Sequence, residues 1–136
     1  MITLEDLLVA ARTIYGEARG ESFEGQKAVM HVILNRVGRS KRDHNIASVC
    51  LRGYQFSCWN VSDPNRNKLL SIDVSSDEFR RALCAALAAI DGPDFTNNAR
   101  HYLTRARRLK GWPRSWGDVK KPCFELGNHL FFNDVK

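Results

Sequence analysis

The chain has 136 residues, of which 43% are hydrophobic and 26% are charged, and its formal net charge is +6. This length and composition are those of one globular domain with a hydrophobic core. No stretch approaches the roughly 18 consecutive apolar residues of a transmembrane helix, which excludes a membrane-spanning chain. The excess of basic residues favours an anionic partner, such as nucleic acid, an anionic membrane surface or another anionic polymer.

The first helix is expected to begin after Thr3 and to end within residues 15–21 (YGEARGE). Apolar residues recur before this segment at i, i+3, i+4 spacing, which indicates an amphipathic helix. Gly20 is expected to cap it in the left-handed conformation. Glu17 lies at the border of the apolar stripe, where partial desolvation raises the pKa of a carboxyl group. Such a group can donate a proton near neutral pH, although a Glu at a helix end is more often a solvated charge.

Two further helices are predicted along the chain. Residues from about 23 to 37 are apolar nearly all round and predict the buried central helix, with Gly38 as its C-terminal cap. The sequence of residues 75–78 (SSDE) is a capping box that starts another helix, which Gly92 and Pro93 end. Residues 39–74 look mostly irregular, and a loop this long in a compact domain is usually functional.

Two stretches are candidates for ligand contact. Residues 54–59 (YQFSCW) combine aromatic side chains with one Gln, which suits stacking against sugars or bases, while packing of Phe56 and Trp59 onto the core is equally compatible. Residues 100–121 contain eight Lys or Arg and one acid, with three aromatic residues interleaved. This basic stretch is typical of a polyanion-binding surface, although a run of charge is more often a solvated face.

The four cysteines do not form a CxxC pair, which argues against a structural zinc site. Cys84 lies in an apolar helical pattern and is expected in the core. Cys50 and Cys58 are close enough along the chain to form a disulfide. The N-terminus lacks the basic start and cleavage site of a signal peptide, so we expect synthesis in the cytoplasm and free thiols.

Six motifs occur in order along nearly the whole chain: YGEARGE (15–21), GQKAV (25–29), NRV (35–37), QFSCW (55–59), ARHY (99–102) and GNHLFF (127–132). With these motifs the chain resembles the SleB/CwlJ family of cell-wall hydrolases. The resemblance implies a lysozyme-like single domain over residues 1–136, without a separate wall-binding domain. Together with the helical patterns it predicts an α+β, predominantly α-helical fold. A short strand-like run ending at Phe132 supplies the small β element.

The resemblance also implies an activity and a site. Members of the family cleave peptidoglycan in spore germination and phage lysis, and one essential Glu ends the first core helix of their catalytic domain. By motif that residue is Glu17, and the bond expected to be cleaved is the MurNAc–GlcNAc β-1,4 linkage. The residues expected to bind the substrate are Glu21, Gln55, Phe56, Trp59, His101, Tyr102, Trp116 and His129. The chain departs from the family pattern at Arg100, where a small or polar residue is commoner.

A mechanism with one carboxylate is favoured, because Glu21 follows the expected helix break and the remaining acids have no motif around them. Glu17 would protonate the glycosidic oxygen and then remove the proton from the C6 hydroxyl of the muramoyl sugar. The product is a 1,6-anhydro sugar, and this is lytic transglycosylation. Muramidase-type hydrolysis of the same bond is the close alternative.

Alternatives of other classes have less support. A basic nucleic-acid-binding module would use the basic stretch but leaves the ordered motifs unexplained. A metallohydrolase using His101 and His129 lacks any HExxH spacing, and we expect neither a metal nor another cofactor. We expect a monomer that binds peptidoglycan glycan strands and no nucleic acid, with the basic stretch contacting anionic envelope polymers. A basic domain without a signal peptide resembles a phage endolysin, which is made in the host cytoplasm and reaches the wall after release.

Overall fold

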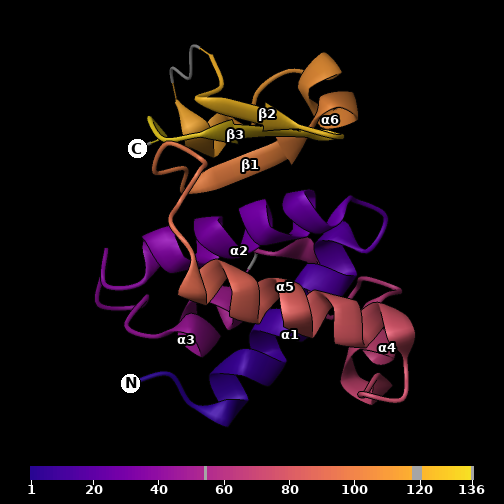
Figure 1. Cartoon of the computed structure of the whole chain (residues 1–136). Helices are drawn as coiled ribbons and strands as arrows, with labels where there is room; N and C mark the ends of the chain where they lie inside the picture. Colours follow the sequence, from indigo (N-terminus) through magenta and orange to yellow (C-terminus); the bar gives the residue numbers. More distant parts are fainter. Residues whose placement is uncertain (54, 118–120, 136) are drawn as a thin grey trace.

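The computed structural model describes residues 1–53, 55–117 and 121–135. The helices labelled η are short 3-10 helices. The elements in chain order are α1 (Leu4–Ala18), α2 (Phe23–Arg36), α3 (Ile46–Leu51), η1 (Ser57–Trp59), α4 (Arg66–Ser71), α5 (Asp77–Asp91), β1 (His101–Thr104), α6 (Arg105–Leu109), η2 (Arg114–Trp116), β2 (Phe124–Leu126) and β3 (His129–Phe132). Helices α1 to α5 form one layer and the three strands form a second layer over α2 (Figure 1). In the described residues no helix is long and apolar enough to cross a membrane.

Helix α1 begins as predicted, and its end differs from the prediction. Thr3 and Asp6 form a reciprocal capping box at its start. The helix ends at Ala18 with Arg19 in a right-handed conformation, and Gly20 is not among the glycines with positive φ. The Glu21 N–H instead donates to the Ala18 carbonyl oxygen at 2.9 Å, and this turn ends the helix.

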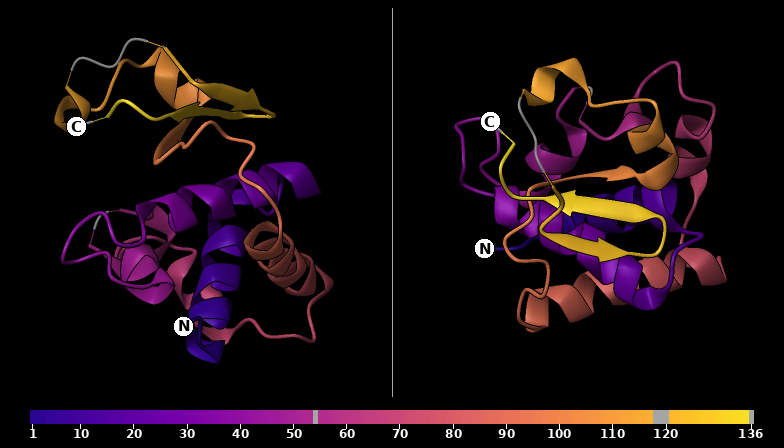
Figure 2. Two further views of the ribbon diagram at one scale, coloured as in Figure 1. Left: turned by 60° about the vertical axis from the view of Figure 1, so that its left-hand side comes forward. Right: turned by 90° about the horizontal axis from the view of Figure 1, so that it is seen from above.

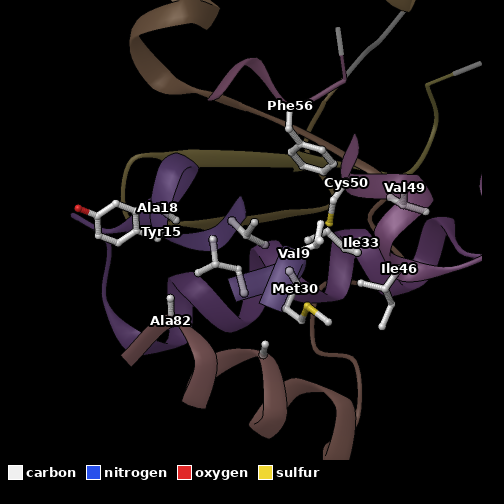
Figure 3. Close-up of a cluster of buried hydrophobic side chains, with 14 of the residues drawn as sticks. Val9, Tyr15, Ala18, Met30, Ile33, Ile46, Val49, Cys50, Phe56 and Ala82 are labelled. Carbon is white, nitrogen blue, oxygen red and sulfur yellow. The ribbon is translucent and has the colours of Figure 1, made fainter. Parts of the chain in front are cut away.

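Helix α2 is the buried central helix that the sequence predicts. Its residues 28–33 are all buried, and it packs against α1, α3, α5 and β1. Gly38 has a φ of 81° after the last turn, in agreement with its predicted role in ending the helix. Figure 3 shows the main core, in which Val9 of α1, Met30 of α2, Ile46 of α3 and Ala82 of α5 gather. Alanines on α5 leave room for α1 and α2 to approach it closely.

The region 39–74 is more ordered than the sequence suggests. It contains α3, η1 and α4, none longer than six residues, so each is too short to show a clear hydrophobic period. Asn45 starts α3 with its own capping box. The expectation that Cys84 is a core residue is wrong, since it lies exposed on the outer side of α5. All four cysteines are free, and Cys50 and Cys58 are both buried.

The small β element is an antiparallel sheet of order β1-β3-β2. Its strands lie as a separate layer above the helices in the side view of Figure 2. Successive side chains of β3 point to opposite faces. Phe131 packs with Ala28 and Val32 of α2, whereas Phe132 packs with Trp112 and Trp116. One face of the sheet is therefore seated on the helical layer.

Candidate active site

A cleft of about 860 Å³ is lined by residues of both layers. Its walls come from α1, α2, the segment around η1, β1, α6, η2 and β3. The volume lies within the range of about 300–1,000 Å³ that is usual for ligand sites. Most of the predicted site residues line this cleft: Glu17, Gln55, Phe56, His101, Tyr102, Trp116 and His129. Tyr54 and residues 118–120, which belong to the two candidate stretches, lie outside the described residues.

Glu17 lies in the last turn of α1, against the start of η1. Burial raises the pKa of its carboxyl group above the ordinary value. Hydrogen bonds from the backbone N–H groups of Ser57 and Cys58 and from the Cys58 thiol oppose this shift, and the negative charge of Asp63 adds to it. The direction is the one expected for a carboxyl at the border of an apolar stripe. The site therefore holds a carboxyl group that can carry a proton at a higher pH than a solvated Glu.

The raised pKa of Glu17 predicts a pH-dependent stability difference. A group whose pKa is higher in the folded state stabilises the fold while it is protonated, below its unfolded pKa, and this stability is lost as the pH rises through the folded pKa. Glu17→Gln should therefore unfold at a higher temperature than the wild type at pH 7, and the difference should shrink toward pH 4. Thermal unfolding at both pH values checks this. The exposed Glu78 provides the control, because Glu78→Gln should give no gain at pH 7, and a gain for Glu17→Gln that is equal at both pH values would contradict the pKa argument.

Gly16 allows η1 to approach Glu17. A Cβ atom at Gly16 would lie 2.7 Å from the Cβ and 2.8 Å from the Sγ of Cys58, and 3.0 Å from a methyl group of Leu69. Such distances are shorter than van der Waals contact, so any side chain there would push Cys58 away. The close approach keeps the hydrogen-bond donors of Ser57 and Cys58 against the Glu17 carboxyl group. This role of Gly16 was not predicted from the sequence.

The strand register brings Tyr102 toward the helical layer. Tyr102 pairs with Phe131, so both side chains are on the face that packs on α2. Its ring contacts His129 with centroids 4.8 Å apart and Phe56 at 6.3 Å. Burial and the negative charge of Glu17 raise the pKa of Tyr102 well above its usual value. Tyr102 therefore remains a neutral phenol close to Glu17, with a hydroxyl that can donate.

Gln55 is held in one orientation by Arg36. The Arg36 Nη2 group donates to the Gln55 Oε1 atom at 2.6 Å. A guanidinium has donors only, so the amide oxygen must face it and the amide NH2 group remains available to a ligand. Arg36 is buried and also lines the cleft. It was not predicted as a site residue, although a charged residue at the end of an otherwise apolar helix was a signal for one.

Glu21 does not line the cleft, and the structure gives it another role than the predicted contact with substrate. Its carboxylate accepts hydrogen bonds from the backbone N–H of Asn128 at 2.8 Å and from the Asn128 Nδ2 group at 3.1 Å. It lies 3.5 Å from the Nδ1 atom of His129. Gly127, at a φ of 57°, leaves the space that this carboxylate fills, since a Cβ there would lie 2.5 Å from Oε1. Glu21 thus fixes the β2–β3 turn to the junction of α1 and α2.

Trp59 is also placed outside the cleft, contrary to its prediction as a stacking residue. Its Nε1 group donates to the Thr13 Oγ1 atom at 2.8 Å, which pins the ring to α1. There it lines a second, smaller pocket with Arg12 and Leu70. Phe56 lines the cleft but is buried, and its ring belongs to the main core as well.

The two histidines of the cleft are in different surroundings. The register places His101 and His129 on opposite faces of the sheet, which does not favour a shared metal. No group of three or more His, Cys, Asp or Glu is placed to hold a metal ion within residues 1–53, 55–117 and 121–135. Burial lowers the pKa of His129, and the charge of Glu21 opposes this shift. His101 contacts Trp116 edge to face with ring centroids 5.4 Å apart.

Comparison with known proteins places the chain among cell-wall enzymes. A family model described as Cell Wall Hydrolase matches residues 20–132. The spore cortex-lytic enzyme of Halalkalibacterium halodurans is 33% identical over 94% of this chain and 34% of its own length. That of Bacillus subtilis is 32% identical over 93% of this chain and 37% of its own length. The chain thus spans little more than a third of these two relatives.

Two solved structures have the same fold. The crystal structure of the catalytic domain of the Bacillus cereus SleB protein superposes with a TM-score of 0.72 at 26% identity, covering 98% of this chain and 93% of that one. The catalytic domain of the germination-specific lytic transglycosylase SleB from Bacillus anthracis gives 0.69 at 30% identity, covering 96% of each chain. The predicted α+β, lysozyme-like class is confirmed. The family match begins at residue 20, after Glu17. Over residues 20–132 the sequence fits the family model, and the chain belongs to the Cell Wall Hydrolase family.

Proposed function

We propose that this domain degrades peptidoglycan by cleaving the MurNAc–GlcNAc β-1,4 bond as a lytic transglycosylase, with Glu17 as its single acid and base. One observation carries the proposal. Glu17 has a raised pKa and is the only acidic side chain among the described residues that line the cleft. A glycosidase that uses two carboxylates needs the second within about 10 Å, facing the same bond. The Glu21 carboxylate accepts a hydrogen bond from Asn128 and does not line the cleft.

The reaction uses one carboxyl group twice. Protonated Glu17 gives its proton to the glycosidic oxygen as the bond to the anomeric carbon of MurNAc breaks. The N-acetyl group of the same sugar stabilises the positive charge at that carbon. The Glu17 carboxylate then takes the proton of the C6 hydroxyl, whose oxygen bonds to the anomeric carbon. A 1,6-anhydro end forms without water, and Glu17 regains its proton.

The other residues of the cleft suit a sugar chain. The amide NH2 group of Gln55 and the hydroxyl of Tyr102 offer hydrogen bonds to sugar oxygens. The ring of Trp116, half-buried at the cleft wall, offers a face to the apolar side of a pyranose. Digestion of purified peptidoglycan tests the activity: soluble muropeptides are expected, and their absence with correctly folded protein would refute it.

Tyr102→Phe tests these sugar contacts. The change removes the hydroxyl donor, keeps the shape of the ring and adds no charge to the cleft. We expect the rate of muropeptide release to fall about 2- to 10-fold, the scale of one hydrogen bond of about 0.5–1.5 kcal/mol. The free energy of unfolding should change by less than about 1 kcal/mol. Tyr15→Phe is the matched control because Tyr15 does not line the cleft, and an equal loss in that variant would contradict the assignment.

The basic stretch is proposed to assist encounter with anionic envelope polymers. Arg105, Arg107 and Lys110 are exposed on or beside α6, and Arg108 lies over the ring of Trp112 at 3.9 Å. Changing these four basic residues together to Gln should weaken binding to purified cell walls and flatten its salt dependence, since exposed charges act over a distance that salt screens. Cosedimentation at low and high salt measures this. The exposed pair Lys41 and Arg42, changed to Gln, serves as control. Unchanged binding at low salt would mean that the stretch is ordinary solvated surface.

A further inference from the structure

Three arginines gather in one part of the cleft wall, and we call Arg36, Arg52 and Arg100 the arginine cluster. They come from the end of α2, the residue after α3 and the residue before β1. The Arg36 Nη1 group donates to the backbone carbonyl oxygen of Arg100 at 3.5 Å, which joins two of them. All three positive charges act on the neighbouring His101.

The positive charge of the arginine cluster is not balanced by the described part of the protein. Among the described residues one carboxylate is paired with the cluster: Asp43 lies 2.9 Å from the Arg52 Nη1 atom, and its charge also acts on Arg36. Arg36 is only 7% exposed and bonds to a neutral amide and a neutral carbonyl group. The guanidinium of Arg100 donates to the carbonyl oxygen of Asn133. Within residues 1–53, 55–117 and 121–135, three cations therefore face one anion.

A buried guanidinium that hydrogen-bonds only to neutral groups is costly, so Arg36 is expected to meet an anion in the working complex. His101 lies beside the cluster, and the positive charges of the cluster also act on it. Burial, with the charges of Arg36, Arg100 and Arg52, lowers the pKa of His101 to about 4. At neutral pH the imidazole is uncharged, and its buried Nδ1 atom has no hydrogen-bond partner in the described residues. This part of the cleft thus presents donors and positive charge to a ligand.

We propose that the arginine cluster is a subsite for a carboxylate carried by the muramoyl residue. The inference rests on the proposed function, because in peptidoglycan the sugar rings are neutral and the carboxylates hang from the lactyl group of MurNAc. When a peptide stem is attached, the lactyl carboxyl is an amide and the stem supplies the carboxylates; when the stem is absent, the lactyl group itself is the anion. Planar guanidinium groups suit a carboxylate, which two N–H donors can bind side by side. The cluster would distinguish muramoyl from uncharged sugars and set the register of the strand over Glu17.

Three forms of one peptidoglycan preparation test the subsite: native strands, strands with carboxylates converted to amides by carbodiimide and ammonium, and strands stripped of stems by an amidase. Rates are measured in about 0.5 M salt, which screens distant charges more than contacts inside a cleft. We expect the wild type to cleave native strands at least about tenfold faster than amidated strands, the scale of one charge-assisted hydrogen bond. Stripped strands identify the source. In native strands the carboxylates belong to the stem, whereas in stripped strands the anion is the lactyl carboxylate. A rate on stripped strands like that on native strands would show that the subsite also accepts the lactyl carboxylate, and a rate like that on amidated strands would show that it accepts only stem carboxylates.

Arg100→Gln tests whether the arginine cluster causes the faster cleavage of native strands. It removes one charge but keeps the backbone carbonyl that Arg36 uses, so the fold should persist. We expect the concentration of native strands needed for half-maximal rate to rise about tenfold. The ratio of the cleavage rate on native strands to that on amidated strands should fall toward one. Arg100→Lys should restore most of the ratio. Arg114→Gln, an exposed change outside the cleft, should leave the ratio unchanged. Equal rates of the wild type on native and amidated strands would overturn the subsite and leave the proposed function standing, whereas no cleavage of any form would overturn the proposed function itself.

Discussion

Glu17→Gln is expected to lower the rate of peptidoglycan cleavage by at least about 10²-fold, the scale of one general acid. The amide keeps the shape of the carboxyl group and its neighbours, but it has no proton to transfer to the glycosidic oxygen. Turbidity loss of a peptidoglycan suspension measures the rate, and circular dichroism shows whether the fold is kept. Because the charged form of Glu17 is disfavoured by burial, the variant should be folded and at least as stable as the wild type at neutral pH.

Glu21→Gln is the informative comparison for this variant. The amide oxygen can still accept a hydrogen bond from Asn128, so the β2–β3 turn should stay attached and the loss of rate should be milder. Glu78→Gln, on the surface of α5, should behave as the wild type. If Glu17→Gln cleared the turbidity at nearly the wild-type rate, Glu17 could not be the catalytic acid. If Glu21→Gln were the inactive variant instead, the two residues would have to exchange roles.

Gly16→Ala is expected to reduce activity and stability together. The new methyl group would overlap Cys58, and overpacking of this kind costs about 1–3 kcal/mol. Relief of the overlap requires η1 to move away from α1, which withdraws the donors of Ser57 and Cys58 from Glu17. The pKa of Glu17 should then rise further, because these hydrogen bonds favour the carboxylate. The pH dependence of the cleavage rate and the free energy of unfolding are the two measurements.

The same motif contains the control for this change. Gly20 has open space around the position of a Cβ atom and no positive φ, so Gly20→Ala should leave activity intact. Its effect on stability should be neutral or slightly favourable, since alanine has less freedom in the unfolded chain. A harmless Gly16→Ala would show that the close approach of η1 is not needed to arrange Glu17. An equally damaging Gly20→Ala would show that any change in the motif is harmful.

The helices with long apolar periods and capping signals were predictable from the sequence, and the short ones were not. Helices α1, α2 and α5 each have fourteen or fifteen residues, so their patterns repeat several times. Helices α3 and α4 have six residues each, and their stability comes from packing against α1 and its neighbours rather than from their own sequence. The exposure of Cys84 shows a related limit of the sequence analysis. An apolar pattern does not tell which face of a helix is buried until the helices that pack against it are known.

The sequence predicted the site residues that belong to motifs. It did not predict the roles that residues acquire through tertiary contacts. Tyr102 and Gln55 belong to motifs, and the strand register and Arg36 bring them to the cleft. Trp59 has the same sequence context as Gln55, yet a single hydrogen bond to Thr13 turns it away. The part played by Gly16 is visible only when η1 is in place. No pattern in one chain encodes such distances between segments.

Mass spectrometry of the muropeptides released from purified peptidoglycan in water enriched in ¹⁸O tests the central claim most directly. The proposed mechanism predicts muramoyl ends in the 1,6-anhydro form, lighter by one water than reducing ends, and without ¹⁸O. Glu17→Gln should release neither form. Reducing MurNAc ends that contain ¹⁸O would contradict transglycosylation and identify hydrolysis of the same bond by the same acid.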